Sequence, residues 1–179
     1  MKTFNKNMVF MDYETTGIDT SIKTQDVPIQ IGCIFTNRHL EIKEEYQSHI
    51  KWPKMNLWKE WPEKHMPAFK IHKISLETVK KYGLSPAKIC KELKQVCSKF
   101  DPLPVIISDA PSFEMFWTKL IFENDTDRPT SFPFHYNAWS VYPLLQFDDI
   151  SVDMKPHDAY EDALLLYKAV KKSYKMRQK

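Results

Sequence analysis

A run of four apolar residues that leads into two acidic residues constrains the fold of this chain most strongly. The run is Met8–Met11, and Asp12 and Glu14 follow it before the chain reaches Gly17. A short apolar run bounded by a turn residue predicts a buried strand, and alternate residues of a strand point to the same face. Asp12 and Glu14 therefore place two carboxylates side by side where a buried strand ends.

Two neighbouring carboxylates at the end of a buried strand are costly unless a positive charge lies between them. Divalent cations such as Mg²⁺ prefer carboxylate oxygens, so Asp12 and Glu14 are candidate metal ligands. The alternative is an edge strand whose two acidic side chains simply face water. These residues alone leave both interpretations open, because short motifs also arise by chance.

The composition is that of an ordinary folded domain. The chain has 179 residues, of which 42% are hydrophobic and 27% charged, and we expect one domain over residues 1–179. A net charge of +3 is too small to indicate a nucleic-acid binder by itself. An odd number of cysteines without a CxxC pair argues against a disulfide framework and fits a cytoplasmic protein. We expect neither a signal peptide nor a membrane span, because no apolar run approaches the roughly 18 residues that a span needs.

The pattern predicts an α/β fold built on a mixed sheet of five strands with helices on both faces. The strands are expected at residues 9–13, 27–35, 40–50, 104–108 and 134–139. Because the first three are separated by short connections, they should form a largely antiparallel meander. Helices are expected over 75–83, from Ser85 with Pro86 at its first position, from near Ser112, over 141–146 and over 159–172.

Residues 51–70 form an excursion of different character. This stretch holds five lysines, three prolines and three tryptophans, which are Trp52, Trp58 and Trp61. Interleaved tryptophan and lysine would suit a surface that stacks bases and neutralises phosphates of a single strand. The alternative, which we favour, is a loop whose tryptophans pack on their own core, because lysine runs usually form a solvated surface.

Further acidic residues lie at the starts of two expected helices. Glu114 falls in the first turn of the helix that begins near Ser112, where the helix dipole favours an acidic side chain. Asp162 lies in the first turns of the last helix, and His157 precedes that helix.

The residues at the two ends of the chain resemble the DnaQ-like exonucleases, the DEDDh branch of the RNase H-like superfamily. Asp12-Tyr-Glu-Thr-Thr-Gly17 has every residue of that family's first motif. His157, Asp162 and Ala163 match its third motif, a histidine followed after four residues by aspartate. The resemblance spans nearly the whole chain, and residues 51–70 match least.

The second motif departs from the family pattern. The family carries Asn-Ala-x-Phe-Asp, with the aspartate at the start of a helix, whereas this chain has Ser108-Asp-Ala-Pro-Ser-Phe-Glu114. Glu114 keeps the position next to Phe113 and is the favoured ligand, and Asp109 at the strand end is the alternative.

The resemblance implies a metal-dependent 3′→5′ exonuclease that releases nucleoside 5′-monophosphates from single-stranded DNA or RNA. Two divalent cations, Mg²⁺ or Mn²⁺, would stabilise the attacking and leaving oxygens of an in-line displacement. The ligands would be Asp12, Glu14, Glu114 and Asp162, with Asp12 bridging the two ions. His157 would be the general base, since an imidazole can accept a proton at neutral pH. Substrate binding is expected from Thr15, Thr16, Gly17 and Phe113.

Other functions stay open at this stage. The altered second motif makes a catalytically weak nucleic-acid-binding protein with the same fold the main alternative, and a phosphoesterase acting on small nucleotides is a third. Some relatives act as dimers, so a homodimer with the 51–70 excursion at its interface is a further expectation. The sequence does not distinguish DNA from RNA, because that choice depends on contacts to the 2′-hydroxyl.

Overall fold

The computed structural model of this protein describes residues 4–18, 26–53, 67–123, 132–135, 137–145 and 157–176. In chain order its elements are β1 (Met8–Thr15), β2 (Pro28–Thr36), β3 (Ile42–His49), α1 (Pro67–His72), α2 (Leu76–Tyr82), α3 (Pro86–Cys97), β4 (Val105–Ser108), α4 (Pro111–Glu123), β5 (Ala138–Ser140), α5 (Tyr142–Leu145) and α6 (Ala159–Met176). Within these ranges no helix is both long enough and apolar enough to cross a membrane.

The five strands form one mixed sheet in the order β3-β2-β1-β4-β5. β1 pairs antiparallel with β2, and β2 with β3, which confirms the predicted meander. β4 lies parallel to β1 on its other side, and β5 lies parallel to β4. β1 is therefore the central strand, and the carboxyl ends of β1 and β4 meet at the same edge of the sheet.

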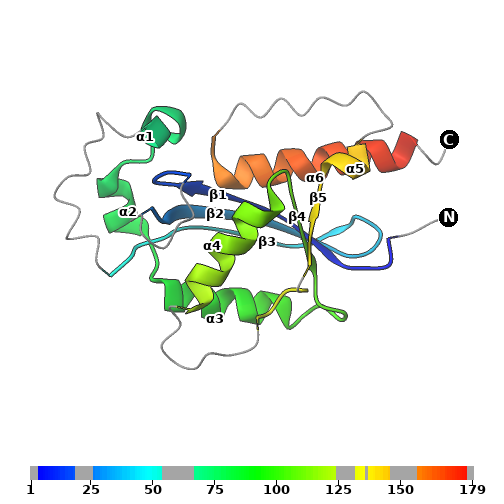
Figure 1. Ribbon diagram of the computed structural model, residues 1–179. Helices are drawn as coiled ribbons and strands as arrows, with labels where there is room; N and C mark the ends of the chain where they lie inside the picture. Colours follow the sequence, from blue (N-terminus) through cyan, green and yellow to red (C-terminus); the bar gives the residue numbers. More distant parts are fainter. Residues whose placement is uncertain are drawn as a thin grey trace.

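Helices lie on both faces of the sheet, as predicted, with α3 and α4 on one face and α5 and α6 on the other (Figure 1). A hydrophobic core lies between the sheet and the helices on each face. Val9, Met11 and Tyr13 of β1 face the larger core, to which α3 and α4 contribute. Met8 and Phe10 face the smaller core, which is closed by α5 and α6. Since side chains alternate along a strand, Asp12 and Glu14 continue the α6 side of β1.

A serine side chain caps the start of each of α2 and α3. Ser75 and Ser85 are the N-caps, and their hydroxyls accept hydrogen bonds from the backbone amides of Thr78 and Lys88 at 3.0 and 3.3 Å. Gly83 ends α2, as predicted. Its φ of −69° shows that the stop does not depend on a left-handed conformation.

Two predictions needed correction or completion. The fifth strand spans only Ala138–Ser140, because Phe134 packs in the larger core against Phe35 and Phe122 instead of pairing with β4. α1 was not predicted as a helix.

Trp52 packs in the larger core and donates a hydrogen bond to the carbonyl of Pro28 at 2.7 Å, as the packing interpretation expected. Trp58 and Trp61 lie outside the described residues.

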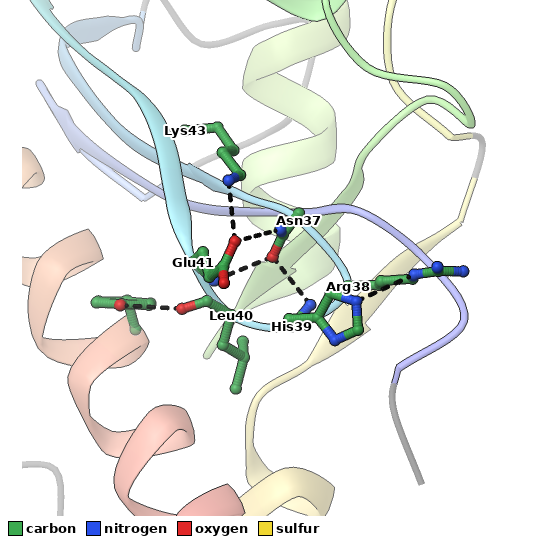
Figure 2. Close-up of polar contacts among 7 residues, drawn as sticks. Asn37, Arg38, His39, Leu40, Glu41 and Lys43 are labelled. Atoms are coloured by element: carbon green, nitrogen blue, oxygen red, sulfur yellow. Dashed lines mark hydrogen bonds and ion pairs between the residues drawn. The ribbon is translucent and has the colours of Figure 1, made fainter. Parts of the chain in front are cut away.

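The turn between β2 and β3 lies at the end of β1 that is away from Asp12 and Glu14. Polar contacts within this turn and with α6 tie the helix to the sheet (Figure 2). The Asn37 side-chain carbonyl accepts hydrogen bonds from the amides of His39 and Glu41 at 2.9 and 3.1 Å. Within this turn Leu40 adopts a left-handed conformation with φ of 59°, and its side chain is fully buried. The Tyr167 hydroxyl of α6 donates to the Leu40 carbonyl at 3.1 Å, which fixes the middle of α6 over the sheet.

Candidate active site

Four segments bring acidic side chains to the edge where β1 and β4 end. Asp12 and Glu14 lie on β1, Asp109 directly follows β4, Glu114 lies in the first turn of α4, and Asp162 lies in the first turn of α6. All of the sequence-predicted acidic residues therefore converge, although up to 150 positions separate them along the chain.

The first group of acids consists of Asp12, Asp109 and Glu114. One carboxylate oxygen from each lies within 4.8 Å of the others. Glu114 is 2% exposed, and the Ser108 hydroxyl donates a hydrogen bond to its Oε2 at 2.5 Å. The two residues that the sequence left as alternatives, Glu114 and Asp109, thus both lie beside Asp12.

The second group consists of Glu14, Asp162 and His157. One carboxylate oxygen of each acid and one ring nitrogen of His157 lie within 4.8 Å of one another. Glu14 and Asp162 are buried, whereas His157 is exposed and has φ of 47° just before α6 begins. The histidine therefore lies at the solvent-facing side of the group.

Burial and mutual repulsion raise the pKa values of all four predicted ligands. Burial raises the pKa of Glu114 to about 8, with Asp109 adding to the effect. Burial followed by repulsion from Asp162 raises the pKa of Glu14 to about 7. Burial raises the pKa of Asp162 to about 6, although His157 opposes the shift. The pKa of Asp12 lies well above its usual range, first through burial and then through repulsion from Glu114.

These residues fit divalent cations. Asp162 is only 4% exposed, and its Oδ1 has no hydrogen-bond partner among the described residues. A buried carboxylate oxygen without a donor is unfavourable, and so are neighbouring carboxylates that share one site. A bound hard cation relieves both costs, because it coordinates carboxylate oxygens and neutralises their charge.

The turn after β1 is held by its own side chains. The Thr15 hydroxyl donates to the Gly17 carbonyl at 2.6 Å, and the Thr16 hydroxyl donates to Asp26 at 3.2 Å. Thr16 also accepts a hydrogen bond from the Val27 amide at 3.0 Å. Both threonine hydroxyls therefore shape this turn beside the acids.

Phe113, the last of the residues predicted to bind substrate, lies at the start of α4 next to Glu114. It is partly buried and packs edge-on against Trp117, with ring centroids 5.5 Å apart. The contact with Trp117 fixes the orientation of the Phe113 ring.

His72 is a site neighbour that sequence analysis missed. It ends α1, is buried, and its Nδ1 accepts a hydrogen bond from the Ile74 amide at 2.9 Å, so Nε2 carries the proton. Burial lowers the pKa of His72 to about 4; the Thr15 backbone partly opposes this shift and nearby His157 adds to it. No local pattern in the sequence indicated where this ring would lie.

A comparison with protein families now identifies the chain. The model of the exonuclease family that includes RNase T matches residues 9–170. The chain belongs to this exonuclease family. The match confirms the resemblance to DnaQ-like exonucleases, and the matched residues include every acid of the two groups.

Solved structures of exonucleases share the fold. Escherichia coli exonuclease I in a zinc-bound complex with single-stranded DNA matches with a TM-score of 0.68 and 17% identity, over 97% of this chain and 41% of that one. Exonuclease I from Methylocaldum szegediense matches with a TM-score of 0.67 and 19% identity, over 97% and 41%. This exonuclease-family chain thus spans about two fifths of those chains. Among curated proteins, no sequence matches it.

Proposed function

We propose that this protein is a divalent-metal-dependent 3′→5′ exonuclease that hydrolyses single-stranded nucleic acid to nucleoside 5′-monophosphates. The observation that carries the proposal is the pair of adjacent ligand groups at the end of β1, with the buried Asp162 Oδ1 lacking a donor among the described residues. Divalent cations held by these two groups would stabilise the charge on the attacking and leaving oxygens of an in-line displacement.

The roles of the acids follow from their grouping. Each group contains one acid from β1, Asp12 in the first and Glu14 in the second. Because these two residues project from the same face of β1, the two groups are neighbours. Asp109 and Glu114 would complete the ligands beside Asp12, and Asp162 those beside Glu14. Glutamate in place of the family's aspartate is compatible with this role, because the Ser108 hydrogen bond orients the carboxylate of Glu114.

His157 is suited to accept the proton of the attacking water. It lies next to Glu14 and Asp162 but is exposed, so the ring can reach a water molecule at the edge of the site. Histidine is the side chain that enzymes most often use as a general base. The turn at residues 15–17 and the ring of Phe113 would hold the terminal nucleotide.

Single-stranded DNA is the first substrate to test, because E. coli exonuclease I has been solved in a complex with single-stranded DNA and in another with a dT13 oligonucleotide. RNA is a second candidate, since none of the contacts above selects for or against a 2′-hydroxyl. Single-stranded DNA and RNA of equal sequence should therefore be assayed in parallel, each with Mg²⁺, with Mn²⁺ and with a chelator.

The decisive variants are Asp12→Ala and His157→Ala, with Glu123→Ala as the matched control. Glu123 is an exposed acid at the far end of α4. We expect metal-dependent shortening by the wild type and the control, loss in Asp12→Ala, and a roughly 10²–10⁴-fold slower rate in His157→Ala. Binding of oligonucleotides without shortening under any metal would contradict the proposal and indicate a nucleic-acid-binding protein that keeps the fold.

A further inference from the structure

Gln30 links the start of β2 to the start of α6. It lies on β2, directly opposite Glu14 of β1, and is only 5% exposed. Its Nε2 donates a hydrogen bond to Asp158 Oδ2 at 2.8 Å. Its Oε1 accepts a hydrogen bond from the Ala159 backbone amide at 3.1 Å. One side-chain amide thus uses its donor and its acceptor on two consecutive residues that are almost 130 positions away.

Asp158, which Gln30 holds in place, in turn restrains the start of α6. Its Oδ1 accepts hydrogen bonds from the amides of Tyr160 and Glu161 at 3.1 and 3.2 Å, so it caps the helix. Its backbone carbonyl accepts from the Asp162 amide at 2.9 Å. Because both carboxylate oxygens of Asp158 are engaged in these contacts, Asp158 is a brace for the helix rather than a further member of the ligand groups.

The helix start rests directly on β2 beside Gln30. Gly32 lies two residues further along the same face, and a Cβ there would lie 2.2 Å from the Ala159 carbonyl oxygen. Only a residue without a side chain permits this approach. The hydrogen bonds of Gln30 therefore fix the lateral position of the first turn of α6, and Gly32 permits its short distance from the sheet.

We propose that Gln30 is a positioning residue that holds His157 and Asp162 beside Glu14. His157 immediately precedes the braced residue, and Asp162 follows it by one helical turn, so both depend on where Asp158 and Ala159 lie. The catalytic consequence rests on the exonuclease function proposed above, whereas the structural restraint does not.

The chemistry of the pair requires an amide at position 30. Glutamate has the same shape and still accepts from the Ala159 amide, but it places a second carboxylate against Asp158. Asparagine at position 158 can still cap α6, but it turns an amide donor toward the Gln30 donor. Rotating the Gln30 amide does not repair this contact, because its NH₂ group would then face the Ala159 N–H.

The double variant Gln30→Glu/Asp158→Asn restores the contacts with the direction of one hydrogen bond reversed. One oxygen of the introduced glutamate would accept from the Ala159 amide and the other from the asparagine NH₂ group, at unchanged net charge. The experiment compares wild type, both single variants and the double variant. Gln95→Glu, an exposed residue on α3, is the control for the same chemical change elsewhere.

The first readout is hydrogen exchange of the amides of residues 159–162, which requires no catalysis. We expect both single variants to lose protection there, with the amides of α3 and α4 unchanged, and the double variant to regain it. The second readout is the rate on the best oligonucleotide substrate. We expect kcat to fall roughly 10²-fold in each single variant with little change in KM, and to recover in the double variant.

Normal protection in both single variants, or loss that the double variant does not repair, would overturn the proposal. Should Gln30→Glu fail to fold, Asp158→Asn and the double variant decide the question. If the wild type proves inactive on every substrate, the exonuclease proposal fails, but hydrogen exchange still supports or refutes the restraint. Unchanged kcat despite lost protection would refute the positioning role.

Discussion

Replacing Gly32 with alanine tests whether the close contact between the start of α6 and β2 determines the geometry of the site. The new Cβ would lie 2.2 Å from the Ala159 carbonyl oxygen and 2.3 Å from the Tyr160 amide nitrogen. Ordinary contact begins at 3.4 Å, so the helix start must move away by about 1.2 Å. The obstructing atoms are backbone atoms of a capped helix, so no side-chain rotation relieves the clash.

Two magnitudes follow from this displacement. Overpacking of this kind costs about 1–3 kcal/mol of folding free energy, and each kcal/mol lowers Tm by roughly 2–4 °C in a domain of this size. A displacement of about 1 Å in a catalytic group lowers the rate by roughly 10²-fold. We therefore expect a modest loss of stability together with a disproportionate loss of activity.

The assay combines thermal unfolding, Mn²⁺ titration by calorimetry and oligonucleotide shortening. Gln47→Ala is the matched control, because Gln47 is exposed and lies directly opposite Gly32 on β3. Gly32→Ala should lower the Tm, weaken Mn²⁺ binding and slow oligonucleotide shortening. Gln47→Ala should change none of these three quantities. A Gly32→Ala protein with wild-type stability and rate would refute the close contact. Lost stability with a full rate would refute its effect on the site.

The remaining predictions concern the acids and the far end of α6. Glu114→Gln keeps the side-chain shape but removes a charge, so divalent-cation affinity measured by calorimetry should fall about tenfold or more, or about 1.4 kcal/mol. In chelator, Tm should fall as pH rises from 5 to 8, because the folded state holds protons on Glu14 and Glu114 that the unfolded state releases. Saturating Mg²⁺ should remove most of this fall. Tyr167→Phe removes the donor to the Leu40 carbonyl and should cost about 1 kcal/mol of stability without changing cation affinity.

Each of these expectations has a contrary result. Wild-type cation affinity in Glu114→Gln would leave Asp109 as the second-motif ligand. A Tm in chelator that rises from pH 5 to pH 8 would contradict the raised pKa values of the buried acids. Weakened cation binding in Tyr167→Phe would show that the β2–β3 turn affects the site from the other end of the sheet.

The sequence predicted the central elements because local pattern determines them. The apolar runs of β1 and β2 and the Ser85-Pro86 start of α3 are readable without tertiary information. The fifth strand was drawn too long because the aromatic Phe134 suits a strand and a core equally well, and only packing against Phe35 decides between them.

In the site, the residues of the first and third motifs could be predicted from the sequence. The contacts between residues that lie far apart along the chain could not. Alternation along β1 placed Asp12 and Glu14 on one face. Asp109 and Glu114 appeared as alternatives, because the side-chain direction at a strand end depends on how α4 packs back onto the sheet. No feature of the sequence indicated a role for Gln30 in the site. Its partners are almost 130 residues away, and the contact exists only once α6 lies on β2.

The most direct test of the central claim compares one single-stranded oligonucleotide labelled at its 3′ end with the same strand labelled at its 5′ end. With Mg²⁺ or Mn²⁺, we expect the 3′ label to be released at once as a nucleoside 5′-monophosphate. The 5′ label should pass stepwise through shorter strands, and chelator should abolish both changes. Release of the 5′ label first, internal cleavage, or equal rates in chelator would contradict a metal-dependent 3′→5′ exonuclease.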